Sequence, residues 1–376
     1  MEMKPMAVSH QEGLKKEDAK MSKYVRRSLL LINSAMLGIG NCGGPLIMRL
    51  YFVRGGKRIW FSSWLETGGW PFLLIPLAAS YFHRRRAKRG GGGDSPDNDT
   101  KLFFMKPLVF FACVVIGILT GVDDYLYAYG MARLPVSTSS LIIASQLGFT
   151  AFFAFLLVRQ KFTSYSINSI FLLTVAAVVL GLHTNGDRPA NESKKEYFMG
   201  FFLTLAAAAL YGLVLPMVEL TYKKANQIIT YSLVMEMQLV ISVFATLFCT
   251  IGMLVNKDFE VIPREAREYE LGESKYYLVA VFSAFIWQFF FLGSIGVIFY
   301  GSSLLAAVII TALLPVTEVL AVFFFQESFK VEKGISLALS LWGFASYFYG
   351  EFKASKKSKR TPKPVNPQLH PPLTHV

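Results

Sequence analysis

Lysine and arginine are missing from the interiors of ten long apolar stretches, although the chain contains 38 of these residues and has a formal net charge of +13. Two lysines, Lys106 and Lys333, lie at the edge of a stretch, and each occupies its first position. Binding a phosphate or another anion inside the protein would call for such a cation. The absence therefore argues against an anion-binding interior. Because the basic residues flank membrane-length segments, it also argues against nucleic-acid binding.

Cysteine and histidine are scarce, with 3 and 5 copies. The cysteines fall inside apolar stretches and show neither a disulfide framework nor metal-ligand spacing. His183 is the one histidine close to the interior of a stretch, and no HExxH or histidine–carboxylate cluster accompanies it. The sequence therefore predicts no enzyme, no metal site and no cofactor.

A literal dinucleotide fingerprint occurs at Gly38–Gly43, but it lies within an apolar run with no preceding strand. Nucleotide binding is therefore rejected. Gly40 and Gly44 instead form a small-xxx-small pattern, which predicts close packing between two helices.

Apolar side chains are abundant, 53% of the total, and they are gathered in blocks. A helix of about 20 apolar residues crosses a bilayer. We therefore predict an all-α integral membrane protein with ten transmembrane helices. The predicted spans are 28–48, 60–82, 106–129, 136–158, 164–183, 198–220, 228–254, 276–299, 302–325 and 333–350.

Two polar tails flank the predicted ten-span domain at 28–350. Residues 1–27 and 351–376 are expected to be cytosolic, the second tail disordered. Basic residues concentrate in these tails and in the loop from His83 to Arg89, which favours both termini inside. This orientation places the sequon at Asn191 outside, where it is a candidate glycosylation site.

A weak internal repeat relates residues 136–183 to 303–350. It suggests two halves, about 28–183 and 198–350, each with five helices. An odd number of spans makes the second copy enter the membrane inverted. Inverted repeats are typical of alternating-access transporters with a substrate site near the midplane. The alternative is two hairpins that are similar in composition alone.

Carboxylates, unlike cations, do occur in the predicted spans. A charge there costs about 2.5–3.5 kcal/mol or more, so a retained acid is expected to face water or a partner. Glu219 lies four residues before Lys223, which predicts an interfacial ion pair. The other acids are candidates for carrying a coupling proton. They are Glu66, Asp123, Asp124, Glu236 and Glu318.

Glu236 and Glu318 lead these candidates because neither has a basic residue within one turn, and an unpaired, desolvated carboxylate can bind a proton near neutral pH. Glu318 shares a helical stripe with Thr311 and Pro315. Asp123 and Asp124 allow two interpretations. They are either hydrated at the outer end of their span or a mutually repelling pair suited to proton uptake.

Polar and aromatic residues near midspan predict a site for one planar nitrogen heterocycle. Such a ring needs an aromatic face for stacking and amides that donate and accept hydrogen bonds. Trp287 is predicted to stack on the ring, with Gln146 and Gln288 contacting its polar edge. Ser139, Gln146 and Thr150 form one polar stripe. Weaker candidates are Asn41, Tyr211 and Trp64. The alternative is structural interhelical hydrogen bonds and a lipid-facing tryptophan.

Several motifs carry a family resemblance from the first span to Lys353. They include Gly43-Gly44-Pro45-Leu46, Gly55-Gly56-Lys57-Arg58-Ile59-Trp60, Gly69-Trp70-Pro71, Tyr125-Leu126-Tyr127, Leu134-Pro135-Val136-Ser137-Thr138, Gln160-Lys161-Phe162-Thr163, Leu314-Pro315-Val316-Thr317-Glu318 and Trp342-Gly343-Phe344. With these motifs in order, the chain closely resembles the plant purine permeases, a branch of the drug/metabolite transporter superfamily.

The resemblance implies proton-coupled uptake of adenine, cytokinins and related heterocycles across a membrane, most simply the plasma membrane, without a cofactor. Some similar proteins move alkaloids such as nicotine, or vitamin B6, which is the alternative for this chain. A membrane receptor or scaffold without transport is a minor alternative. Similar sequences often carry Asp-Asn where this chain has Asp123-Asp124, and the extra acid would favour a cationic solute.

Overall fold

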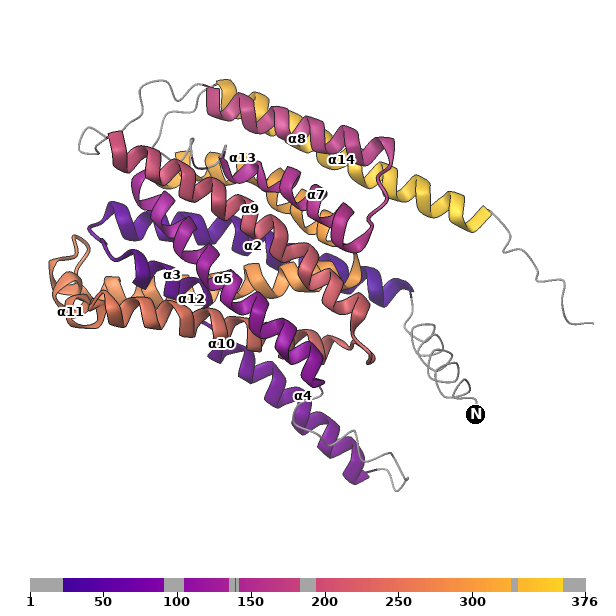
Figure 1. Ribbon diagram of the computed structural model, residues 1–376, viewed down its shortest axis with the longest axis horizontal. Helices are drawn as coiled ribbons and strands as arrows, with labels where there is room; N and C mark the ends of the chain where they lie inside the picture. Colours follow the sequence, from indigo (N-terminus) through magenta and orange to yellow (C-terminus); the bar gives the residue numbers. More distant parts are fainter. Residues whose placement is uncertain are drawn as a thin grey trace, which may run out of the picture.

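Helices make up the regular structure of the computed structural model, which describes residues 23–90, 105–134, 139, 142–182, 194–325 and 331–360 (Figure 1). No strand occurs in these ranges, which confirms the predicted all-α class. The helices are α2 (Lys23–Val53), α3 (Ile59–Thr67), α4 (Pro71–Gly90), α5 (Pro107–Arg133), α7 (Gln146–Val158), α8 (Ser164–Leu182), α9 (Lys194–Lys224), α10 (Tyr231–Val255), α11 (Asp258–Glu268), α12 (Glu273–Tyr300), α13 (Ser303–Phe325) and α14 (Val331–Arg360).

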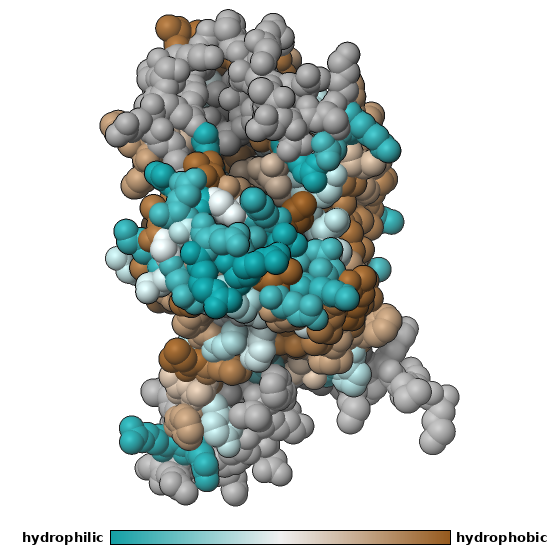
Figure 2. Space-filling model, turned by 90° about the vertical axis from the view of Figure 1, so that its left-hand side faces the viewer, coloured by the Kyte–Doolittle hydropathy of each residue, from teal (hydrophilic) through white to brown (hydrophobic). Residues whose placement is uncertain are grey.

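Within the described ranges, six helices are long and apolar enough to cross a bilayer. They are α2, α5, α9, α10, α12 and α13. Their length and composition support the predicted integral membrane protein, whereas the count of ten spans remains a prediction. Figure 2 agrees with this assignment, because apolar side chains flank a polar patch at one end of the molecule.

The predicted second span is interrupted, because α3 ends at Thr67 and α4 begins at Pro71. A Cβ atom on Gly69 would collide with the carbonyl oxygen of Ala284 on α12, so a residue without a side chain is needed at this crossing. Pro71 lacks a backbone N–H and therefore fits the first turn of a helix. The break leaves α3 as a short helix of 9 residues that packs against α5, α10 and α12.

Contacts between the helices follow a paired pattern. Helix α2 packs on α12 and α13, while α9 packs on α5 and α7. Helices α8 and α14 lie side by side at one edge of the molecule, and α7 packs on α13 (Figure 1). Exchanging α2 with α9, α5 with α12, α7 with α13 and α8 with α14 maps the contacts of α2 onto those of α9. The same exchange maps the α8–α14 contact and the α7–α13 contact each onto itself.

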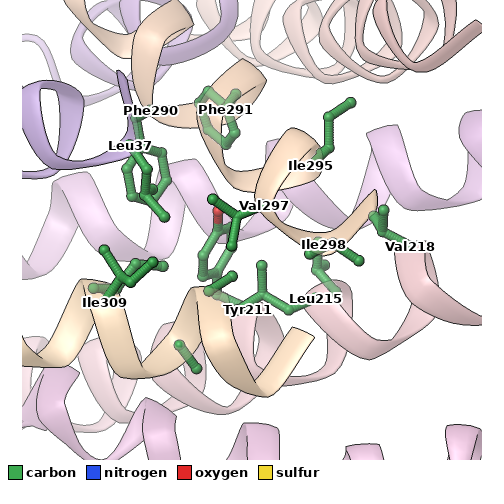
Figure 3. Close-up of a cluster of buried hydrophobic side chains, with 14 of the residues drawn as sticks. Leu37, Tyr211, Leu215, Val218, Phe290, Phe291, Ile295, Val297, Ile298 and Ile309 are labelled. Atoms are coloured by element: carbon green, nitrogen blue, oxygen red, sulfur yellow. The ribbon is translucent and has the colours of Figure 1, made fainter. Parts of the chain in front are cut away.

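Small residues allow α2 and α12 to approach closely. A Cβ atom on Gly40 would collide with the backbone of Phe290, and one on Gly44 would lie 2.7 Å from Cε2 of Trp287. The predicted packing role of these two glycines is therefore confirmed. Around this contact, Leu37 from α2, Tyr211 from α9, Phe290 from α12 and Ile309 from α13 gather in one apolar cluster (Figure 3).

Candidate functional site

A cavity of about 90 Å³ lies among helices of both predicted halves. One water molecule requires roughly 10–15 Å³ of such volume, so the cavity accommodates a solute of several heavy atoms. Helices α2, α3, α5 and α7 line it from the first half, and α9, α12 and α13 from the second. The polar and aromatic lining residues include Asn41, Glu66, Asp123, Asp124, Tyr127, Ser139, Gln146, Tyr211, Trp287 and Thr317.

Three carboxylates face this cavity. Glu66 comes from the last turn of α3, and Asp123 and Asp124 lie midway along α5. All three side chains are buried, and Glu66 Oε1, Asp123 Oδ1 and Asp124 Oδ2 have no hydrogen-bond partner among the described residues. No lysine or arginine is among the described residues that line the cavity. The site is therefore acidic and can bind a proton, a cation or a hydrogen-bond donor.

Two threonine hydroxyls connect α10 to one of these carboxylates, Asp124. Thr246 on α10 donates a hydrogen bond to the hydroxyl of Thr67 at 3.2 Å, and Thr67 hydrogen-bonds to Asp124. These bonds hold Asp124 against α3 and α10. They leave its Oδ2 atom available for a solute or a proton.

Hydrogen-bond donors face the same cavity. Trp287 Nε1, Gln146 Nε2 and Ser139 Oγ are buried without a partner in the described structure. An unsatisfied buried polar group costs about 1–3 kcal/mol, so a solute that pairs with these groups gains affinity. Donors and acceptors thus converge on one space, as the polar edge of a heterocycle requires.

Comparison with known proteins decides the family. A family model described as purine nucleobase transmembrane transport matches residues 28–357. Purine permease 3 of Arabidopsis thaliana is 55% identical over 334 residues, which cover 89% of this chain and 93% of that protein. The chain belongs to the purine permease family. The predicted resemblance is confirmed, and this family member is an integral membrane transporter rather than an enzyme.

Two further comparisons agree. Purine permease 2 of Arabidopsis thaliana is 54% identical over 342 residues, which cover 88% of this chain and 94% of that protein. A crystal structure of another protein, 16% identical, has a TM-score of 0.56 and covers 85% of this chain and 97% of its own. At this identity the similarity shows a shared fold alone.

Two predicted substrate contacts lie away from the cavity of this purine permease. Gln288 Nε2 donates to the carbonyl oxygen of Thr67 at 3.2 Å, which ties α12 to the end of α3. Trp64 Nε1 donates to Thr250 Oγ1 at 3.1 Å. Neither residue lines the cavity. Because successive residues of a helix point about 100° apart, Trp287 and Gln288 do not share one face.

Glu236 and Glu318, the acids that the sequence favoured as proton carriers, are not among the described residues that line the cavity. Glu236 is buried on α10, a helix that contributes no residue to the cavity lining. Glu318 lies on α13, but its side chain is outside the described part of the structure. The cavity-facing stripe of α13 is Ile310, Leu314 and Thr317, next to the predicted stripe of Thr311, Pro315 and Glu318. The glycosylation candidate Asn191 also lies outside the described residues.

Other predicted residues are brought together. Asn41, Gln146, Tyr211 and Trp287 all line the cavity, although they come from four helices. The side-chain amide of Asn41 donates to the carbonyl oxygen of Ile310 at 3.1 Å. Near the C-terminal end of α9, Glu219 forms the predicted ion pair with Lys223 at 2.8 Å, which confirms its structural interpretation.

Sequence reasoning gave little weight to Tyr127 and missed Thr317, although both line the cavity. Tyr127 lies one turn after Asp123 on α5, and Thr317 lies seven residues after Ile310 on α13. This helical spacing would have identified both residues once one cavity-facing position on each helix was known.

Proposed function

We propose that this purine permease imports purine bases and purine derivatives, such as adenine and cytokinins, together with protons. Purine nucleobase transport is the activity that describes the matching family. One observation carries the rest of the proposal. The buried cavity between the halves combines three carboxylates with unpartnered donors, and no cation lines its described part.

Recognition of the base would use the two chemistries that line the cavity. Trp287 provides an aromatic face, and stacking on such a face contributes about 1–3 kcal/mol per base. Gln146 and Ser139 would donate to ring nitrogens, while the carboxylates would accept from an exocyclic amino group. Asn41 and Tyr211 would contact the base from the remaining sides of the cavity. Gln288 and Trp64, which do not line the cavity, would hold α3 in position through their hydrogen bonds.

Proton coupling is assigned first to Glu66, Asp123 and Asp124. Three neighbouring carboxylates repel one another in a low-dielectric site, and one bound proton relieves part of this repulsion. The proton would thereby make the site ready for a neutral solute. Glu236 and Glu318, which the sequence favoured, remain the alternative proton carriers.

Alternating access would move the two five-helix halves against each other. The exchange pattern of helix contacts supports an inverted repeat, because a two-fold relation between halves produces such reciprocal pairs. The described ends of α2 and α14 lie at the same end of the molecule, opposite α11 (Figure 1). Chain ends on one side of a membrane require an even number of spans, which fits the predicted ten. We assign both termini to the cytosol from the basic residues that flank the spans, and the protein to the plasma membrane.

Uptake of radiolabelled adenine in a yeast strain that lacks purine uptake tests the proposal. We expect faster uptake at an external pH of about 5 than at about 7, and loss of accumulation with a protonophore. Surface-expressed protein without adenine uptake would overturn the purine assignment. Uptake that is independent of pH and protonophore would overturn the proton coupling.

The acidity of the cavity favours a second candidate function. Asp124 adds a third carboxyl group to the cavity, and a cationic solute would pair with these groups in their ionised form. An alkaloid such as nicotine, or a form of vitamin B6, fits this condition. Competition of adenine uptake by nicotine and pyridoxine separates the two assignments, since a preferred substrate competes at lower concentration.

A further inference from the structure

A buried carboxylate on α11 joins the outer ends of several helices. Glu265 is only 7% exposed. Its Oε1 atom accepts hydrogen bonds from the hydroxyls of Tyr51 at 2.6 Å and Tyr276 at 3.1 Å. Its Oε2 atom accepts from the backbone N–H of Lys57 at 3.1 Å and from Nε of Arg58 at 3.4 Å. Four donors thus satisfy one carboxylate at the polar end of the molecule.

A second acid strengthens this network. Asp258 at the start of α11 is fully buried and lies 3.8 Å from Nη1 of Arg58. Arg58 therefore bridges two carboxylates of the same short helix. Its backbone N–H also donates to the hydroxyl of Tyr51 at 3.2 Å. Polar side chains of this end form the teal patch in Figure 2.

The network connects the two predicted halves. Tyr51 and Arg58 belong to the end of α2 and the connection to α3, in the first half. Asp258, Glu265 and Tyr276 belong to α11 and the start of α12, in the second half. Any separation of the halves at this end must therefore break hydrogen bonds to a buried charge, which are stronger than neutral ones.

The short helix α3 connects this network to the cavity. Arg58 immediately precedes α3, and Glu66 lies in the last turn of the same helix, where it faces the cavity. A displacement of the N-terminus of α3 would be transmitted to Glu66, because a nine-residue helix moves as a rigid rod. The outer network and the cavity carboxylates are thus mechanically linked.

We propose that Glu265 is the latch that holds the outer end of the cavity closed, and that Tyr51 and Arg58 leave it when the protein opens outward. The inference rests on the proposed alternating access and names the residue that controls it. Glu265 acts through helix position and does not touch the solute. The competing possibility is a permanent tether that keeps α11 in place throughout the cycle.

A disulfide across the same interface distinguishes a latch from a tether. The backbone N–H of Glu270 donates to the carbonyl oxygen of Arg54 at 3.2 Å, and both side chains are exposed. Such close backbones suit a disulfide, so the double variant R54C/E270C can be oxidised. We expect the uptake rate of the oxidised protein to be at least tenfold lower than that of the reduced protein. A reducing agent should restore the rate.

The single variants R54C and E270C, treated with the same oxidant, control for Cys42, Cys113 and Cys249. They should retain uptake. Fully cross-linked R54C/E270C that transports at the rate of its reduced form would overturn the latch, because the interface would then never open.

A second measurement does not depend on the substrate. Met131 lines the cavity, and its replacement by cysteine reports access from outside through a membrane-impermeant thiol reagent. We expect E265Q to raise the labelling rate of M131C about tenfold, since the amide cannot satisfy the same donors. E270Q, which alters an exposed ion pair at the same end, is the matched control and should leave the rate unchanged.

The two experiments keep the proposals separate. Absence of adenine uptake in the unmodified protein would reject the proposed function, while the labelling of M131C would still test the latch. If M131C and the double variant M131C/E265Q are labelled at equal rates, and both elute as folded protein, the latch is overturned. Equal labelling combined with normal uptake would identify the network as a tether.

Discussion

The ring of Tyr127 meets the indole of Trp287 edge-on, with centroids 6.1 Å apart and planes inclined by 82°. Phe290 contacts the same indole at 5.3 Å and 86°. Edge-to-face contacts fix the orientation of an aromatic ring. Trp287 is therefore held as a rigid wall of the cavity, and its Nε1 atom has no partner in the described structure.

Replacement of Trp287 tests its role in stacking. Loss of base–aromatic stacking costs about 1–3 kcal/mol, so W287A should raise the KM for adenine about 5- to 150-fold. W287F keeps a smaller aromatic face but lacks the Nε1 donor, and it should give an intermediate KM. Initial uptake rates against adenine concentration, normalised to surface expression, measure both values. An unchanged KM in W287A would remove Trp287 from the site.

Neutral amides at the cavity acids test proton coupling. E66Q, D123N and D124N cannot bind the coupling proton in the same way, because an amide does not protonate near neutral pH. We expect at least one of them to reduce the ratio of uptake at pH 5 to uptake at pH 7 to about one. E260Q, a change at an exposed position of α11, is the control. If all three cavity variants keep the ratio, E236Q and E318Q become the decisive pair.

The sequence predicted helices better than it predicted their breaks. Apolar blocks of membrane length identify the long helices because hydrocarbon imposes that length. The break between α3 and α4 depends on Gly69 crossing α12, a contact that local sequence does not reveal. Helix α11 was missed because its residues are mostly polar, and its acids are buried only by distant partners such as Tyr51 and Arg58.

The candidate site was predictable in residue type but only partly in position. Buried acids and midspan amides are costly in a membrane, which singled out Asp123, Asp124 and Gln146. Rotation of each helix about its axis is set by packing against its neighbours. The sequence therefore did not separate Trp287, which lines the cavity, from Gln288, which supports α3.

Gly44 sets the position of the Trp287 indole. A Cβ atom there would lie 2.7 Å from Cε2 of Trp287, so G44A must displace the ring or the helix. We expect the KM for adenine to rise about tenfold, within the range of a lost stacking contact. G148A is the matched control, because no atom lies within 4 Å of its new Cβ position. Equal effects of the two variants on uptake kinetics would contradict this assignment.

Glu219 stabilises the turn between α12 and α13. Its Oε2 atom accepts hydrogen bonds from the backbone N–H of Ser303 at 2.8 Å and from the Ser303 hydroxyl at 2.6 Å. E219A leaves these buried donors unsatisfied, which should lower the free energy of unfolding by about 1–3 kcal/mol. Thermal unfolding of the detergent-solubilised protein measures the loss. E260A, at an exposed position, should change the Tm little, and an equal loss in both variants would contradict the role of Glu219.

Asp258 makes the stability of the network around α11 depend on pH. Burial raises the pKa of Asp258, with smaller opposing effects from Asn256 and Arg58. The folded protein therefore binds its proton more tightly than the unfolded chain, so the stabilisation from this group is full below the ordinary pKa of aspartate and is lost as pH rises through the raised pKa.

D258N carries no proton to lose, and its side-chain oxygen can still accept from Asn256. We expect the difference in Tm, D258N minus the unmodified protein, to increase from pH 4 to pH 7, because only the unmodified protein loses stability as Asp258 ionises. Above pH 7 the difference should stay constant. E260Q, a neutralised acid on the same helix but exposed, should show no such trend. A Tm difference that is largest at low pH would show that Asp258 stabilises the fold as a charged partner of Arg58.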